Sequence, residues 1–310
     1  MAATITQNAQ VDIQPGIIND GLIRHYDFAN RNGYKTANGY VWNDLSPYKI
    51  NAKTTGALLP THSTTKENGY GGLIFEGESG VGPRLEIPYV NLGTDSWAVD
   101  LWITHRLSNL YLRGYLAAGD IWSTPTPINP AYTGWAITCG TTGGITMGMR
   151  WPIAYPGTPQ NFRRYGGGTA YTSSNPTVAH IFMHRSTISP YPGFGIFEVY
   201  VNGLRRGWDY VENSINIDNA VSTTIRSDAW WEGGGLDRDR PRGTFHVIKL
   251  YKGIDIFGTT DANEFFTSQF YSSSNRFVLR NYNALCSRFG MPVIPHSAGS
   301  SSDFLNYRRF

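Results

Sequence analysis

The sequence predicts an all-β protein built as a sandwich of two antiparallel sheets. Along residues 97–103, one side of an extended chain carries the apolar side chains Trp97, Val99, Leu101 and Ile103. This period of two, in aromatic and β-branched residues, is typical of a strand with one face in a core. Similar segments recur along the chain, whereas only one segment has helical spacing. With so little helix to cover a sheet, a second sheet is the expected cover.

A second alternating segment lies just before this one. Leu85, Ile87 and Tyr89 share one side, and the turn-forming residues 91–96 separate them from Trp97. We therefore expect these two strands to be neighbours in one antiparallel layer. The 35 glycines and the 14% aromatic content also suit many short strands joined by tight turns.

Further segments have the composition of strands. They cover residues 22–28, 57–59, 73–77, 111–118, 134–139, 145–151, 178–185, 195–202, 207–211, 221–226 and 243–251. Asn202-Gly203 is a strong tight-turn signal, which predicts a hairpin between the strands on either side of it. Residues 152–175 are rich in Gly, Tyr and Pro and are long for a connection within a compact domain. We expect that segment to have a functional or interface role.

One helix is predicted at residues 274–287, and Gly290 is placed to end it. The residues at helical spacing are Phe277, Arg280, Asn281 and Ala284. The chain then divides into an N-terminal arm at residues 1–20, a sandwich domain at residues 21–290 and a C-terminal tail at residues 291–310. Such arms usually fray unless a partner holds them.

Composition excludes several classes of protein. Of the 310 residues, 40% are hydrophobic and 16% charged, as in a globular chain. The net charge of +3, without a long run of Lys or Arg, argues against a nucleic-acid partner. The start of the chain does not resemble a signal peptide, and the sequence has no apolar run long enough to cross a membrane. Cys139 and Cys286 lack metal-ligand spacing, so we expect reduced thiols in a protein made in a cytoplasm.

Several sequence blocks, taken in order, resemble a known family. They are residues 21–27, 42–46, 72–77, 97–103, 197–203, 245–251, 278–284 and 288–290. Together they are similar to the concanavalin-A-like (laminin-G-like) jelly-roll family over about residues 21–290. The closing blocks, Val278–Ala284 and Arg288–Gly290, resemble the copies found in virion proteins of large tailed bacteriophages. The resemblance implies a jelly-roll topology and a viral setting.

Catalytic carboxylates are not evident in the sequence. A retaining glycosidase needs two carboxyl groups about 5–5.5 Å apart, which alternate positions on one strand can supply. Glu76 and Glu78 alternate, but Glu78 falls in a Gly/Ser-rich turn. Asp237 and Asp239 also alternate, in a loop-like segment where arginines stand beside them. We therefore predict that neither pair is catalytic.

Two histidines have a spacing that would suit a metal on a helix. His180 and His184 lie instead in a predicted strand, where a separation of roughly 13 Å rules out a shared zinc ion. The sequence predicts no metal site, no cofactor and no enzymatic activity.

The function predicted from these features is that of a structural component of a bacteriophage virion. The protein would be a capsid decoration or a tail or baseplate protein, assembled in the host cytoplasm. Its arms and loops would contact other virion proteins and copies of itself. The alternative is a lectin-like module that binds carbohydrate on the host surface and aids adsorption. Its stacking platform would be Trp151, Tyr165, Trp230 and Trp231, although such aromatic residues equally suit subunit contacts.

Overall fold

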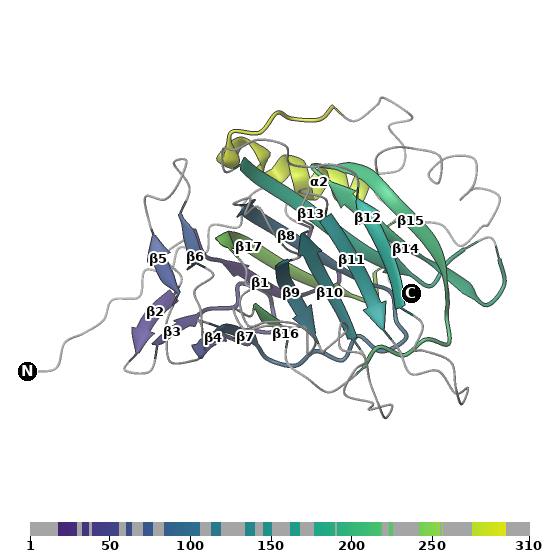
Figure 1. Cartoon of the computed structure of the whole chain (residues 1–310), viewed down its shortest axis with the longest axis horizontal. Coiled ribbons are helices and arrows are strands. Elements are labelled where there is room, and N and C mark those ends of the chain that lie inside the picture. The colour runs from purple at the N-terminus through teal and green to yellow at the C-terminus, as the bar shows by residue number, and fades with distance from the viewer. Residues whose placement is uncertain are drawn as a thin grey trace, which may run out of the picture.

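The computed structural model shows two antiparallel β-sheets stacked face to face (Figure 1). The residues it describes are 18–29, 33–36, 39–55, 60–63, 71–76, 84–105, 113–118, 134–139, 145–150, 162–167, 177–189, 191–218, 223–225, 242–254, 256 and 275–295. Within these ranges, α-helix is confined to one C-terminal segment. The predicted fold class, an all-β sandwich with one short C-terminal helix, is confirmed. Most of the predicted arm and tail lies outside the described residues.

The first sheet has eight strands in the order β15-β14-β13-β8-β17-β6-β5, and β1 also pairs with β17. Its strands are β1 (Leu22–Asp27), β5 (Thr61–Ser63), β6 (Gly72–Glu76), β8 (Trp97–His105), β13 (Thr177–Ser186), β14 (Phe194–Val201), β15 (Leu204–Glu212) and β17 (Arg242–Lys252). The central position of β8, between β13 and β17, explains why all of its described side chains, residues 97–104, are buried.

The second sheet has nine strands in the order β12-β11-β10-β9-β16-β7-β4-β3-β2. Its strands are β2 (Gly33–Thr36), β3 (Gly39–Trp42), β4 (Ala52–Thr55), β7 (Arg84–Ile87), β9 (Arg113–Ala118), β10 (Gly134–Cys139), β11 (Ile145–Arg150), β12 (Phe162–Gly167) and β16 (Thr223–Ile225). All pairings in both sheets are antiparallel.

The prediction that the strands around Leu85 and Trp97 share one layer is wrong. They are β7 and β8, and they belong to different sheets. Strand β7 ends before Pro88, which cannot donate to a ladder. The connection then turns through Gly93, at a φ of 53°, and buries Leu92 in the core between the sheets. The chain thus crosses from one sheet to the other instead of folding back as a hairpin.

Some strands were not predicted from the sequence. Strand β12 lies inside residues 152–175, which were expected to form a long connection. Strands β2 to β5 fall in a region expected to be mostly loop. Each of these four has only three or four residues, too few to show a clear alternation. The weak strand predicted at residues 57–59 lies outside the described residues.

The core between the sheets uses the face of β8 that the alternation predicts. Trp97 and Leu101 are fully buried there, together with Leu85 and Ile87 of the facing sheet. Trp97 packs against Trp135 of β10 with ring centroids 5.8 Å apart. Burial of one large side chain of this kind stabilises the fold by about 1.5–3 kcal/mol.

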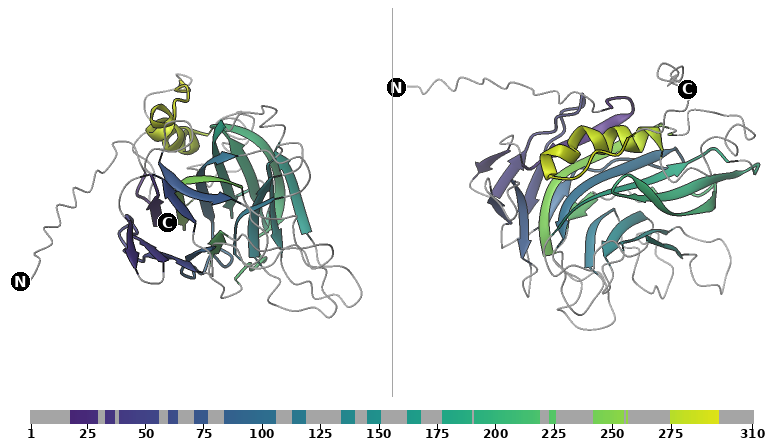
Figure 2. Two further views of the ribbon diagram at one scale, coloured as in Figure 1. Left: turned by 60° about the vertical axis from the view of Figure 1, so that its left-hand side comes forward. Right: turned by 90° about the horizontal axis from the view of Figure 1, so that it is seen from above.

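Helix α2 (Arg276–Cys286) lies on the outer face of the eight-stranded sheet (Figure 2). It begins at Asn275, whose side-chain oxygen accepts a hydrogen bond from the backbone N–H of Phe277 at 2.8 Å. The 3₁₀-helix η4 (Ser287–Phe289) continues it and ends at Gly290, where φ is 65°. The predicted C-terminal helix and its glycine stop are confirmed.

This helix buries part of the second face of the eight-stranded sheet, over its central strands. Trp102 of β8 is fully buried, and its ring stacks on Tyr282 at 5.7 Å and on Phe289 at 4.8 Å between centroids. Ala98 of β8 and Phe182 of β13 join Phe277 in a second buried cluster. Both faces of β8 are therefore covered. In the described part of the chain, no helix is long and apolar enough to span a membrane.

A test of this packing is available at the turn between β14 and β15. Asn202 and Gly203 have φ values of 52° and 76°, which confirms the predicted tight turn. A Cβ atom on Gly203 would lie 2.9 Å from Cδ1 of Ile294 and 3.1 Å from Cδ2 of Leu279. Both atoms are the ends of flexible side chains that can shift, so overpacking adds a modest cost to the backbone strain, and Gly203→Ala is expected to lower the free energy of unfolding by about 2–3 kcal/mol.

The matched control is Gly193→Ala. Gly193 also has a positive φ, of 80°, but a Cβ atom there would have no neighbour within 4 Å. This substitution should cost only the backbone strain, about 1–2 kcal/mol. Urea unfolding of both variants measures the difference. Equal losses would show that the turn does not pack against the helix and the residues after it.

Candidate functional site

The four aromatic residues predicted to form a sugar-stacking platform are not tested by the structure. Trp151, Trp230 and Trp231 lie outside the described residues. Tyr165 lies in β12, where its backbone is opposite Met147 of β11, but its side chain is not among those described. Whether these residues share a surface stays a prediction.

The acidic pairs weighed as catalytic groups are also mostly outside the described residues. Glu76 is the last residue of β6, and its side chain is not described; Glu78, Asp237 and Asp239 fall in undescribed segments. Among the described residues, no group of three or more His, Cys, Asp and Glu side chains is placed to hold a metal ion. Cys286 is a buried free thiol, and burial raises its pKa.

The two histidines of β13 each face a different carboxylate. Nε2 of His180 lies 3.2 Å from Oδ1 of Asp100, without the alignment of a hydrogen bond. Nδ1 of His184 lies 3.7 Å from Oε2 of Glu198. All four side chains are fully buried. Because each histidine has its own acidic neighbour, the two histidines do not form a shared site. Both are part of the buried interior of the fold.

A row of buried charged residues runs beneath α2. His25, Lys249 and Asp100 stand directly opposite one another on β1, β17 and β8. Nζ of Lys249 lies 2.9 Å from Oδ2 of Asp100, and both side chains are fully buried. Burial alone would raise the pKa of Asp100, but the charge of Lys249 holds it well below its ordinary value. Asn281 of α2 accepts a hydrogen bond from the Tyr251 hydroxyl at 3.0 Å, so this layer joins the helix to the sheet.

Among the described residues, three aromatic rings in contact with one another lie on β15 and in the loop before β14. Tyr191 and Trp208 are 52% and 38% exposed. The ring of Tyr210 lies between them, edge-to-face with both, at centroid distances of 4.8 Å to Tyr191 and 5.2 Å to Trp208. We call Tyr191, Trp208 and Tyr210 the aromatic patch. Contiguous exposed apolar surface of this kind marks interaction sites more often than isolated side chains do.

Strand β15 forms one edge of the eight-stranded sheet (Figure 1). The register of its residues places the aromatic patch on the outer face of that sheet. Tyr210 and Trp208 are two positions apart on β15, so their side chains lie on one face. Tyr210 packs against the buried cluster beneath α2, which identifies that face as the outer one. In the loop before β14, the Ser189 hydroxyl lies 3.0 and 2.8 Å from the carbonyl oxygens of Tyr191 and Phe194 and shares its hydrogen between them, which holds the backbone that carries Tyr191.

A β-bulge brings a guanidinium group onto the same face. The register shifts between Val199 and Tyr200, so that β15 has one extra residue opposite this point. Arg205 and Trp208 are an odd number of positions apart and would face opposite sides of a regular strand. With the bulge, Arg205 reaches Glu198 at 3.2 Å, and Trp208 lies directly opposite Glu198. Arg205 and the aromatic patch therefore share the outer face.

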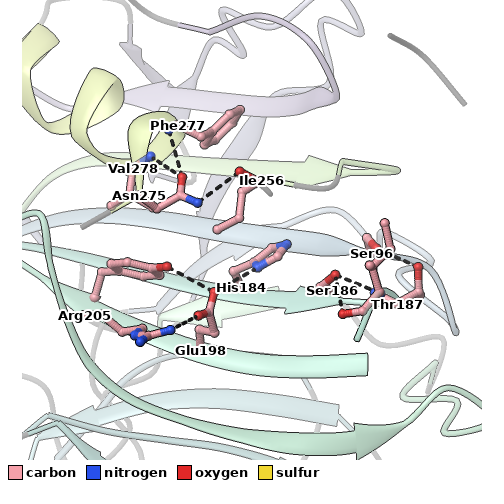
Figure 3. A network of polar contacts seen from close by, with 12 residues as sticks. Ser96, His184, Ser186, Thr187, Glu198, Arg205, Ile256, Asn275, Phe277 and Val278 are labelled. Atoms are coloured by element: carbon pink, nitrogen blue, oxygen red, sulfur yellow. Dashed lines mark hydrogen bonds and ion pairs between the residues drawn. The ribbon is translucent and has the colours of Figure 1, made fainter. Parts of the chain in front are cut away.

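Glu198 lies beneath the edge of the patch and contacts both His184 and Arg205 (Figure 3). Its carboxylate is fully buried and accepts hydrogen bonds from the Tyr200 hydroxyl at 3.1 Å and from Arg205 at 3.2 Å. The nearby charge of Glu198 and burial raise the pKa of Tyr200, burial being the larger cause. The buried Glu198 carboxylate therefore has both a hydroxyl and a guanidinium donor beneath the edge of the patch.

Sequence reasoning missed the aromatic patch, although part of the signal was present. Trp208 and Tyr210 alternate on the last strand of a predicted hairpin, where an edge face is often exposed. Tyr191 lies in a loop, and its approach to Tyr210 depends on how that loop folds back. The bulge at Tyr200 has no sequence signature, so the position of Arg205 could not be predicted.

The fold and the site define a β-sandwich with an exposed aromatic surface at one sheet edge. No family model and no curated protein matches the sequence. The chain is similar to the solved binding domain of paraclostridial mosquitocidal protein 1, with a TM-score of 0.47 and 12% identity over 76% of this chain and 48% of that one. It is also similar to the binding domain of botulinum neurotoxin DC in complex with SialylT, with a TM-score of 0.48 and 11% identity over 76% and 48%. The chain spans about half the length of these structures, and a likeness this distant assigns it no ligand or activity.

Proposed function

We propose that this protein is a non-catalytic carbohydrate-binding domain and that the aromatic patch binds the sugar. The observation that carries the proposal is the set of three contacting rings, two of them well exposed, on a sheet edge. A sugar ring has a C–H face that packs on an aromatic ring and hydroxyls that need hydrogen-bond partners. Ligand sites commonly combine aromatic surface with a few placed polar groups of this kind.

The side chains of the patch supply both an aromatic surface for the sugar ring and hydrogen-bond partners for its hydroxyls. The hydroxyls of Tyr191 and Tyr210 can donate and accept, and the indole N–H of Trp208 can donate. The edge-to-face contacts already fix the rings relative to one another, so binding needs little further ordering of side chains. The site therefore suits a saccharide better than an extended polymer that has no rings.

Trp208→Ala is expected to weaken binding of any sugar that the protein recognises by about tenfold to a hundredfold. Truncation of a central aromatic anchor removes about 1.4–2.8 kcal/mol of binding energy. Because Trp208 is only 38% exposed and packs against Tyr210, the substitution should also lower the thermal unfolding temperature, so a thermal unfolding curve checks that the variant is folded at the temperature of the binding measurement. A glycan array identifies the ligands of the wild-type protein, and isothermal titration calorimetry measures the loss.

The control is Tyr48→Ala, which removes a 60% exposed tyrosine in the turn after β3. This variant should bind like the wild-type protein. If the wild-type protein bound no saccharide on the array, or if Trp208→Ala and Tyr48→Ala bound equally well, the aromatic patch would not be a sugar site.

A role in a bacteriophage virion is a second proposal, supported by the order of the sequence blocks. Packing explains some residues of the closing blocks, 278–284 and 288–290, because Asn281, Tyr282 and Phe289 all face the eight-stranded sheet. Under this proposal the protein is a capsid decoration or a tail or baseplate component, and sugar binding would serve adsorption. Deleting residues 1–20 should then prevent incorporation into particles. Normal incorporation of the shortened protein would reject assembly through that arm.

A further inference from the structure

The β-bulge on β15 places two consecutive arginines next to the aromatic patch. Arg205 and Arg206 fall where β15 has its extra residue, opposite Tyr200. Such bulges re-aim side chains and are common beside functional sites. From Arg206 to Trp208 the chain advances two residues, roughly 7 Å, which is about the span of one sugar ring with its substituent.

Among the described residues, the local charges leave a net positive charge at this end of the patch. Glu198 is matched by Arg205 at 3.2 Å. Arg206 is exposed, and it makes no ion pair with the residues that the structure describes. Asp209 is opposite Phe197, a core residue, and so lies on the other face of the sheet. Glu212 ends the strand, roughly 20 Å from Arg206 at the rise of a β-strand.

We propose that the saccharide bound at the aromatic patch carries a carboxylate, and that Arg206 binds this group while the sugar ring stacks on Trp208. A guanidinium presents two N–H donors to a carboxylate in a fixed geometry, which an exposed arginine beside a ring surface can supply. The inference rests on the proposed function, because it names the class of sugar for that same site. The ligand class is therefore a saccharide that contains a uronate.

The test uses pairs of oligosaccharides that differ only in charge. Oligomers of galacturonate, glucuronate and mannuronate are each compared with their fully methyl-esterified forms, which are neutral. Wild-type protein should bind the acidic member of at least one pair about tenfold more tightly, and this preference should shrink in high salt. Arg206→Gln should lose that preference while it keeps the affinity for the ester.

The matched control is Arg280→Gln, which removes an exposed arginine on α2 and should leave the preference intact. Trp208→Ala should weaken binding of both members of a pair. If wild-type protein bound acid and ester equally in all three pairs, or if Arg206→Gln kept the preference, the inference would be wrong. Binding of the esters that still depended on Trp208 would then leave the proposed function standing. Loss of all dependence on Trp208 would reject that function as well.

Discussion

Replacing Lys249 with methionine is expected to lower the free energy of unfolding by about 3–5 kcal/mol. The ammonium group lies 2.9 Å from a carboxylate oxygen of Asp100, and both side chains have no exposed surface. Methionine fills a similar volume but leaves Asp100 as a buried charge without its main partner. His180, 3.2 Å from the other carboxylate oxygen, is a weaker substitute because the two atoms are not aligned for a hydrogen bond.

Two further variants separate this effect from a general loss of lysine. Lys252→Met removes a lysine of the same strand whose ion pair with Asp95, at 3.0 Å, is solvent-exposed, so it should cost less than about 1 kcal/mol. The double variant Lys249→Met with Asp100→Leu should recover part of the loss, because no unpaired charge stays buried. Urea unfolding measures all three. A Lys249→Met protein as stable as Lys252→Met would show that the buried pair does not hold the outer layer.

The sequence predicted the faces of the strands better than their neighbours. Alternation correctly placed Trp97 and Leu101 in the core between the sheets. It could not show that β8 pairs with β13 and β17, because the alternation of side chains along one strand does not specify which distant strands pair with it. For the same reason the segment after Ile87 was expected to form a hairpin, whereas it crosses to the other sheet.

The second face of the eight-stranded sheet shows a different limit. Asp100 and Trp102 alternate with core residues, as would the outer face of a half-buried strand. The structure buries them under α2, a helix that was predicted from its own spacing and its glycine stop. A helix signal does not say which surface the helix covers. The buried charges were therefore not recognised as a layer, because their partners come from four strands and a helix.

The candidate site depends on tertiary arrangement even more strongly. Alternation could have placed Trp208 and Tyr210 together on one face of a predicted strand. Tyr191 joins them only because Ser189 closes the preceding loop on itself. Arg205 faces the same side only because a bulge shifts the register by one residue. Both devices are local irregularities of the backbone, which periodic patterns do not predict.

Acid is expected to destabilise the protein through His25, by about 3 kcal/mol between pH 7 and pH 4. This side chain lies on β1 and is 8% exposed, and the charge of Arg288 in η4 acts on it. Burial, reinforced by the charge of Lys249 and to a smaller extent by that of Arg288, lowers the pKa of His25 from 6.5 to about 4. Asp27 and Asp100 act in the opposite direction but do not outweigh burial.

The sign of the effect follows from which state binds the proton. As the pH falls through 6.5, the unfolded chain takes up a proton on His25, whereas the folded protein does so only near pH 4. Between these values the unfolded state binds more protons, so stability falls as the pH falls. The lowered pKa of Asp100 acts in a separate window, because its contribution is lost only as the pH falls through and below the ordinary value of 3.8.

The variant that isolates this effect is His25→Gln, which has a similar polar side chain but does not titrate. Urea unfolding of both proteins at several values between pH 7 and pH 4 gives the two stability curves. The wild-type curve should fall by about 3 kcal/mol more than that of the variant over this range, and the two should run parallel above pH 7. Curves that stayed parallel down to pH 4 would mean that His25 takes up its proton equally well in the folded and unfolded states. In that case the charged layer beneath α2 would be open to water, contrary to the burial that places Lys249 and Asp100 inside it.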